Sequence, residues 1–237
     1  MELPLKNISL IIKALNDVGI TNKYLQAGIL ATCWKETGLK PIRENLNYTS
    51  PSRLMFVYPS KFQSSDDTIP YLNNPIKLAN YVYGGKYGNN SDEGFKYRGA
   101  GFNGLTFKNN YIRYSNLSGI DLVSDPDVLN NVDVASKVLA YFYSDMLKKC
   151  NISKYTLDHS NDINNLDAGV RVAVAITSGC PSSTTGNIFR EGLSKASIVA
   201  PELLSIVKTQ KGSGTNKILP LIFVAGSIGL IYLFIKK

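Results

Sequence analysis

Two glutamates eight residues apart are the residues in this sequence best suited to acid–base chemistry, and both lie in the segment WKETGLKPIRENLNY, residues 34–48. Glu36 ends a mostly apolar run with helical spacing, and Glu44 follows a turn through Gly38 and Pro41. A proton donor beside a carboxylate that stays ionised is the equipment that cleaves glycosidic bonds. Taken alone, however, the pair is more typical of two solvated surface charges, because carboxylates are mostly exposed.

The helix that must position the first glutamate is predicted over residues 22–36, where apolar positions recur every three or four residues. On this helix the glutamate shares a face with Leu25, Ile29 and Thr32. We therefore expect its carboxyl group to point inward, against apolar neighbours that raise its pKa, as a general acid requires. The second glutamate lies in a polar stretch, where a carboxylate stays ionised more easily.

The remaining pattern predicts a mainly α fold with an irregular centre. Helical spacing is present in several segments, and strand-like alternation appears nowhere for long. These segments are 1–19, 22–36, 133–150, 163–177 and 187–200, with a further short helix at 201–210. Between residues 39 and 116 glycine, asparagine, serine and tyrosine accumulate, and pieces at 52–58 and 75–83 fit short helical turns. We expect this loop-rich stretch to build a cleft.

The cysteine and histidine content disfavours nucleophilic and metal-dependent chemistry. The chain has three cysteines, Cys33, Cys150 and Cys180, without a CxxC pair, and a single histidine, His159, in a polar stretch. We expect no disulfide framework, no metal site and no cofactor. Cysteine–histidine and serine–histidine–aspartate mechanisms would both depend on that one imidazole, so they are set aside.

The charge distribution argues against nucleic acid as a partner. The formal net charge of +8 is concentrated in the C-terminal tail, because no acidic residue follows Glu202. Five lysines come after it, at positions 208, 211, 217, 236 and 237, which leaves residues 1–207 with a charge of only +3. Nucleic-acid binding needs basic residues clustered with aromatics on the folded surface. We therefore expect no nucleic-acid binding.

The C-terminal segment predicts a membrane anchor. Residues 1–207 form the predicted catalytic domain, residues 208–217 a flexible Gly/Ser linker, and residues 218–235 an uncharged helix long enough to cross a hydrocarbon core. Lys236 and Lys237 follow this helix and suit the membrane interface. The N-terminus lacks the basic start and apolar run of a signal peptide. The expected partner of the tail is a lipid membrane.

Four stretches in one colinear series carry a resemblance to a known enzyme family. They are ETGLKPIRENLNYTSPSRLMFVYPSKF, ANYVYGGKYGN, FKYRGAGFNGLTFKNNYIRYSN and GIDLVSDPDVL, within residues 20–195. The series resembles the family 19 glycoside hydrolases, which are chitinases and the lysozyme-like endolysins of bacterial viruses. The resemblance implies a lysozyme-like glycosidase fold and an inverting mechanism, in which two carboxyl groups lie about 6.5–9.5 Å apart to admit a water.

The resemblance also implies catalytic roles for three residues. Glu36 matches the general acid that protonates the leaving oxygen, and Glu44 matches the general base that activates water. Thr106, in the sequence GAGFNGLT, matches the residue that holds this water.

Sugar contacts are expected at further positions. By the same resemblance, Asn110 and Tyr111 match an asparagine–tyrosine step that touches sugar, and Arg190 matches an arginine after a glycine-rich loop. Tyr97 belongs to a group of aromatics that fits either a sugar-stacking surface or packing beneath a long loop. The group comprises Tyr81, Tyr83, Tyr87, Phe95 and Tyr97.

Departures from the family pattern affect residues that brace the loop or contact sugar. Ala100 and Gly104 stand where the family usually has arginine and glutamine. Lys35 stands where a histidine often precedes the acid, and TSGCPSSTTG, residues 177–186, replaces an asparagine–glycine–glycine turn. Both carboxylates are nevertheless retained.

These observations together predict a membrane-anchored muralytic glycosidase, phage-encoded as an endolysin or virion component, whose partner is the glycan strand of bacterial peptidoglycan. The anchor would place it in a viral membrane or virion, or in the host inner membrane. Two alternatives stay open. One is a non-catalytic peptidoglycan-binding or structural virion protein on the same fold, and the other is a chitinase.

Overall fold

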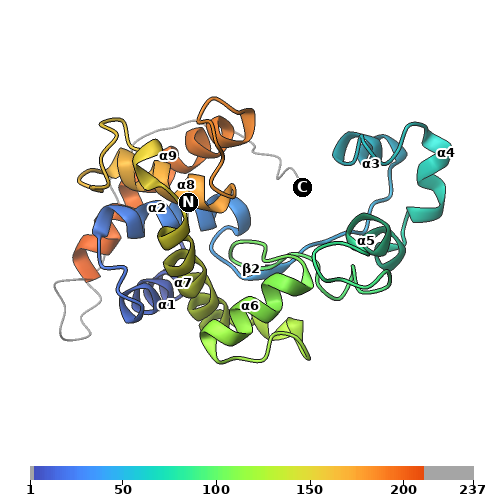
Figure 1. The fold of residues 1–237 in the computed structure, drawn as a ribbon, viewed down its shortest axis with the longest axis horizontal. Helices are drawn as coiled ribbons and strands as arrows, with labels where there is room; N and C mark the ends of the chain where they lie inside the picture. Colours follow the sequence, from blue (N-terminus) through green and yellow to red (C-terminus); the bar gives the residue numbers. More distant parts are fainter. Residues whose placement is uncertain (1–2, 211–237) are drawn as a thin grey trace.

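The computed structural model describes residues 3–210, in which helices from both ends of the chain form one body and the centre of the chain forms a smaller outer lobe (Figure 1). The body contains the longer helices. They are α1 (Leu5–Asp17), α2 (Lys23–Thr37), α7 (Val132–Lys149), α8 (Leu166–Thr177) and α9 (Asn187–Gln210). The predicted mainly helical character is confirmed, and the helical segments predicted for the body all correspond to helices.

The outer lobe is built from short elements between residues 46 and 95. It contains α3 (Pro51–Val57), α4 (Ser65–Thr68), the 3-10 helix η1 (Ile69–Tyr71) and α5 (Pro75–Tyr83). The side chains of Ser50, Ser64 and Asn74 cap α3, α4 and α5 by accepting backbone N–H bonds. The lobe has a small core of its own, made of Leu46, Tyr48, Leu54, Phe62, Leu78, Ala79 and Val82.

A two-stranded antiparallel ribbon and α6 (Lys108–Ser118) connect the lobe to the body (Figure 1). In the ribbon, β1 (Ile42–Arg43) pairs with β2 (Ala100–Gly101). Helix α6 is tied to α7 by a bidentate ion pair, because the Arg113 guanidinium donates to both carboxylate oxygens of Asp145. Two further 3-10 helices are η2 (Pro126–Asn130) and η3 (Ile152–Lys154).

Helix α2 is the central helix of the body and carries Glu36 in its last turn. Every residue from Leu25 to Cys33 is buried, so the helix is enclosed on all sides rather than on the one predicted face. The helix ends at Gly38, whose φ of 62° is the left-handed conformation that glycine adopts without strain.

Two glycines allow the close approach of α2 to α8. A Cβ atom on Gly28 would lie 2.3 Å from the carbonyl oxygen of Gly169, and a Cβ atom on Gly169 would lie 2.2 Å from the carbonyl oxygen of Tyr24. Since no side-chain carbon fits at such distances, the position of α2 in the body depends on both glycines.

A disulfide between Cys150 and Cys180 corrects the expectation that the cysteines would be unpaired. Their Cα atoms lie 5.8 Å apart, a usual spacing for a disulfide. The bond joins the end of α7 to the turn that follows α8, and the odd cysteine, Cys33, is buried in α2. The spacing of cysteines in the sequence gave no sign of this pair, because the bond joins two elements that only the tertiary fold brings together.

The predicted membrane anchor is not supported and is withdrawn, together with the membrane localisation that depended on it. No helix within residues 3–210 combines the length and the apolar composition that crossing a bilayer needs. The longest, α9, has 24 residues but carries charged side chains along its length, Glu202 and Lys208 among them. It continues through Pro201 to Gln210, past the start of the predicted linker. The segment 218–235, to which the anchor was assigned, lies outside the described residues.

Candidate active site

Glu44 is held by hydrogen bonds to two parts of the loop-rich region, Tyr83 and the adjacent residues Arg98 and Gly99. One carboxylate oxygen accepts from the Tyr83 hydroxyl at 2.8 Å, and the other accepts from the Gly99 N–H at 3.3 Å. The Glu44 backbone N–H donates to the Gly99 carbonyl at 2.8 Å, and its carbonyl accepts from Arg98 Nε at 3.2 Å. The Tyr83 hydroxyl and the Gly99 backbone N–H together fix the orientation of the carboxylate, which a general base requires.

Two further tyrosines stand behind Tyr83. The Tyr58 ring packs edge-to-face on Tyr48 with 6.1 Å between ring centroids, and Tyr58 and Tyr83 are close enough to affect each other's pKa. Burial, and after it the nearby charge of Glu44, raises the pKa of Tyr83 far above the ordinary value. Burial is likewise the main cause of the raised pKa values of Tyr58 and Tyr48.

Thr106 lies beside Glu44, on the same side of Gly99. A Cβ atom on Gly99 would stand 3.5 Å from both Glu44 Oε2 and Thr106 Oγ1, so the missing side chain leaves a space that both oxygens border. The Thr106 hydroxyl donates to the Gly104 carbonyl at 2.8 Å, which leaves its oxygen lone pairs available as acceptors. The structure therefore brings the predicted base and the predicted water-holding residue together.

Glu36 is carried by the last turn of α2, the helix buried in the body. Its side chain is 24% exposed and forms an ion pair with Lys35. The Lys35 ammonium reaches α9, where it lies 3.6 Å from the place of a Cβ on Gly192.

A buried polar network lies beneath the end of α2. The Tyr143 hydroxyl is 2.9 Å from Thr32 Oγ1 and 2.6 Å from Thr177 Oγ1. Burial raises the pKa of Tyr143, and the neighbouring Cys33 and Glu36 raise it further. This network links α2, α7 and α8 directly below the predicted acid.

An open groove of about 370 Å³ runs along Glu44 on the side of the outer lobe. It is lined by Ile42, Arg43, Glu44, Asn45, Asn47, Tyr48, Thr49, Ser50 and Arg53. Amide, hydroxyl and guanidinium groups in such a groove suit a hydroxyl-rich ligand. Within residues 3–210, no three His, Cys, Asp or Glu side chains gather in a way that would hold a metal ion.

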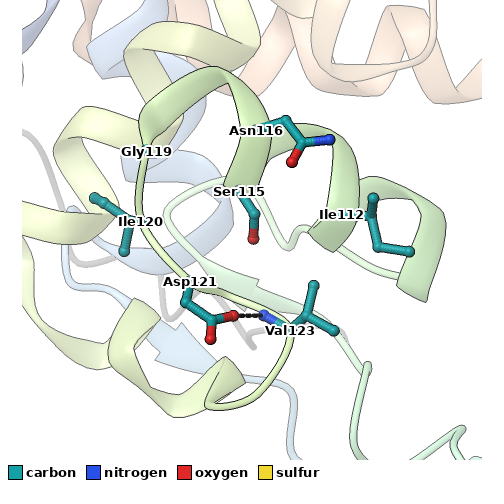
Figure 2. Close-up of a pocket in the computed structure, with 7 residues that line it drawn as sticks. All are labelled: Ile112, Ser115, Asn116, Gly119, Ile120, Asp121 and Val123. Atoms are coloured by element: carbon teal, nitrogen blue, oxygen red, sulfur yellow. Dashed lines mark hydrogen bonds between the residues drawn. The ribbon is translucent and has the colours of Figure 1, made fainter.

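A second hollow, of about 320 Å³, lies at the C-terminal end of α6 (Figure 2). Its one charged lining residue is Asp121, whose carboxylate accepts hydrogen bonds from the N–H groups of Val123 and Ser124. The carboxylate is thus used to shape its own loop (Figure 2). This hollow is lined by none of the predicted catalytic residues, and we assign the site to the groove beside Glu44.

Comparison with known proteins gives a family for this chain. A protein of Haemophilus influenzae (strain Rd) named "Glycosyl hydrolase family 19 domain-containing protein" is 30% identical over 155 residues, which cover 63% of this chain and 76% of that protein. No protein-family model matches the chain. The chain belongs to glycosyl hydrolase family 19. The family predicted from the sequence is thereby confirmed.

Two predicted sugar-contacting residues of this family 19 chain lie inside the protein. Tyr97 is 1% exposed and its hydroxyl donates to the Val123 carbonyl, whereas Tyr111 is fully buried and donates to the Arg98 carbonyl at 2.8 Å. Burial raises the pKa of Tyr111 to about 12, against the opposing effect of Arg43, which donates to the same hydroxyl. The position of both rings suits support of the loop that carries Gly99 and Thr106.

The other two predicted sugar-contacting residues are exposed. The Asn110 amide donates to the Thr106 carbonyl at 2.8 Å, so this residue belongs to the Glu44 side of the site. Arg190 lies in the first turn of α9, where its guanidinium contacts Asn187 at 3.3 Å. It therefore belongs to the Glu36 side, because α9 packs against α2.

Sequence reasoning missed the residues that hold the base. Gly99 was not singled out, and Tyr83 was considered only as one of several aromatics. Arg43, the residue before Glu44, donates to the Lys96 carbonyl and pairs with Asp127 at 3.0 Å, which anchors β1. An arginine adjacent to a candidate base is a signal that could have been used.

Proposed function

We propose that this family 19 chain hydrolyses the β-1,4 bonds between amino sugars of bacterial peptidoglycan by a single displacement. The observation that carries the proposal is the position of Glu44 and Thr106 on either side of the space left by Gly99, beside an open groove. A water held between the two oxygens, in front of Gly99 and further out than a Cβ would lie, would contact both. An ionised carboxylate and a hydroxyl are the groups needed to orient and deprotonate such a water.

In the proposed reaction, Glu44 takes a proton from the water while the oxygen of that water attacks the anomeric carbon. Glu36 donates a proton to the glycosidic oxygen as the bond to the leaving sugar breaks. The seven residues between the two glutamates include the Gly38 turn and β1, so the carboxyl groups approach the sugar from different elements. This suits a mechanism that needs room for water opposite the leaving group.

The Lys35–Glu36 ion pair supports a second candidate function. The Lys35 ammonium contacts the Glu36 carboxylate, so a glycosidic oxygen can reach Glu36 only if Lys35 moves away when the glycan binds. A chain in which the pair persists would bind the glycan without cleaving it. The second candidate is therefore a non-catalytic peptidoglycan-binding protein.

The test compares release of reducing sugar by the full chain with release by Glu36→Gln and Glu44→Gln. The substrates are purified peptidoglycan and a hexasaccharide of N-acetylglucosamine. We expect each variant to lose activity by about 10²–10⁴-fold, the worth of a positioned acid or base. Glu202→Gln, an exposed glutamate on α9, is the matched control and should keep full activity.

Three outcomes separate the candidates. Activity on peptidoglycan that both variants lose supports the proposal, and faster turnover of the hexasaccharide favours a chitinase instead. A parent chain that binds peptidoglycan without releasing sugar, and binds equally after Glu36→Gln, would establish the second candidate.

A further inference from the structure

We propose that Tyr87 and Phe107 form a sugar-binding ledge that extends the glycan site outward from Glu44. The ledge would stack on the apolar face of an amino-sugar ring one or more units away from the bond that is cleaved. This inference rests on the proposed function, because one glycan strand would occupy both the ledge and the groove.

The ledge is continuous with the predicted base. Phe107 directly follows Thr106, and its ring packs edge-to-face on Tyr83 with 5.6 Å between ring centroids. The centroids of the Tyr87 and Phe107 rings lie 4.7 Å apart. Since the Tyr83 hydroxyl donates to Glu44, a row of three aromatic rings leads from the carboxylate to the surface.

Tyr87, the outermost ring of this row, is mostly exposed to solvent. Tyr87 is 69% exposed, and Phe107 and Tyr83 are partly exposed. An exposed large apolar ring next to a site is a feature that marks a binding surface, because its burial by a ligand is favourable. The flat aromatic face matches the CH groups on one side of a pyranose ring.

The backbone of the ledge is strained. Tyr87 has a φ of 44° and Phe107 has a φ of 74°, both in the left-handed region that bulky residues seldom adopt. Residues held in that region cost free energy, and they concentrate at ligand-binding sites. If Tyr87 served only as a turn residue, glycine or asparagine would fill the position with less strain.

A buried asparagine fixes the two loops that present the rings. Asn89 is 5% exposed, and its side chain accepts from the Lys108 N–H at 2.8 Å and donates to the Tyr83 carbonyl at 3.0 Å. The Asn109 N–H also donates to the Tyr87 carbonyl at 3.1 Å. The ledge is therefore held in place before a ligand arrives, which lowers the cost of binding.

The exposed aromatic Tyr81 does not share these properties. Tyr81 is 40% exposed, but its ring stacks on Tyr71 at 4.7 Å and contacts Phe62 within the outer lobe. These contacts explain Tyr81 as a residue that packs within the outer lobe. It therefore provides a matched control for Tyr87.

The test measures binding of the N-acetylglucosamine hexasaccharide and of purified peptidoglycan to the full chain carrying Glu36→Gln, which prevents turnover. We expect Tyr87→Asn to weaken binding about tenfold, because a stacking contact is lost. Asparagine tolerates positive φ, so this variant should unfold at an equal or higher temperature than the parent. Tyr87→Phe should bind as the parent does, and Tyr81→Ala should leave binding unchanged.

The outcomes distinguish the ledge from the function on which it rests. Hydrolysis by the unmodified chain, combined with unchanged glycan binding after Tyr87→Asn, would overturn the ledge and leave the proposed function intact. Absence of binding to either glycan, together with absence of hydrolysis, would overturn both. Weaker binding with retained stability, restored by phenylalanine, supports the ledge.

Discussion

The two predicted catalytic carboxylates are held in opposite ways by the two regions that carry them. Glu36 ends α2, a helix enclosed by the body through close packing, including the contact of Gly28 with Gly169. Glu44 follows a strand of only two residues and is held by hydrogen bonds from Tyr83 and Gly99. Glu36 is thus positioned by the close packing of its helix, whereas Glu44 is positioned by hydrogen bonds to its carboxylate. Substitutions should therefore reduce stability in the first region and activity in the second.

The largest expected effect is on stability, from Gly169→Val. Its side chain would meet the Tyr24 carbonyl oxygen, which belongs to backbone and cannot turn aside. We expect the free energy of unfolding to fall by about 3 kcal/mol, measured by urea denaturation. Gly186→Ala, where a Cβ meets no atom within 4 Å, is the control and should change stability little. Equal stability of the two variants would show that the close approach of α2 and α8 does not limit the stability of the body.

Next is an effect on activity without an effect on stability, from Gly99→Ala. The added methyl group fits at ordinary contact distances of 3.4–3.5 Å from Glu44 and Thr106, so folding should be unaffected. It would narrow the space proposed for the attacking water, and we expect kcat to fall by about 10²-fold. A folded variant with full activity would show that the water lies elsewhere.

A smaller loss of activity is expected for Tyr83→Phe, which removes the hydroxyl that donates to Glu44. A hydrogen bond to a charged group is worth about 1.5–3 kcal/mol, so kcat should fall by about 10–100-fold with KM little changed. Tyr97→Phe removes a hydroxyl that serves a backbone carbonyl instead, and should keep kcat near that of the parent. If both variants behave alike, Tyr83 acts only through packing.

The smallest effect concerns the joint between α6 and α7. The bidentate contact with Arg113 lowers the pKa of Asp145 to about 2, from the ordinary 3.8, with Lys149 contributing. Since the folded pKa is the lower one, this stabilisation is present above pH 4 and is lost as the pH falls through about 2. Asp145→Asn should cost about 1 kcal/mol at pH 7.

The pH dependence provides the check on that substitution. The stability difference between Asp145→Asn and the parent should shrink between pH 4 and pH 2, as followed by thermal unfolding. Asp17→Asn, in the exposed pair with Lys13, is the control and should have almost no effect at either pH. A pH-independent difference would exclude the ion pair as its cause.

Helical periodicity predicted the body well, because local spacing reports on helices directly. It placed Glu36 in the last turn of its helix, as the structure does. It indicated one buried face, however, whereas packing against α8 and α9 buries every residue of α2 from Leu25 to Cys33. The tertiary approach of two glycines, 141 positions apart in sequence, left no local pattern to read. The pairing of Cys150 with Cys180 was missed for the same reason.

The site on the loop side was less predictable. The family resemblance selected Glu44 and Thr106, which the structure brings together around Gly99. The donors to Glu44 come from residues 39 and 55 positions away, and only the folded chain shows them. The buried positions of Tyr97 and Tyr111 could likewise not be read from a stretch rich in glycine and aromatics.

The most direct test of the central claim is the configuration of the product. Proton NMR during hydrolysis of soluble β-1,4-linked amino-sugar oligomers by the full chain distinguishes the two anomers before they equilibrate. Attack by a water held between Glu44 and Thr106 inverts the anomeric carbon, so the α-anomer should form first. First formation of the β-anomer would contradict the account, because it requires a covalent intermediate that this arrangement does not use.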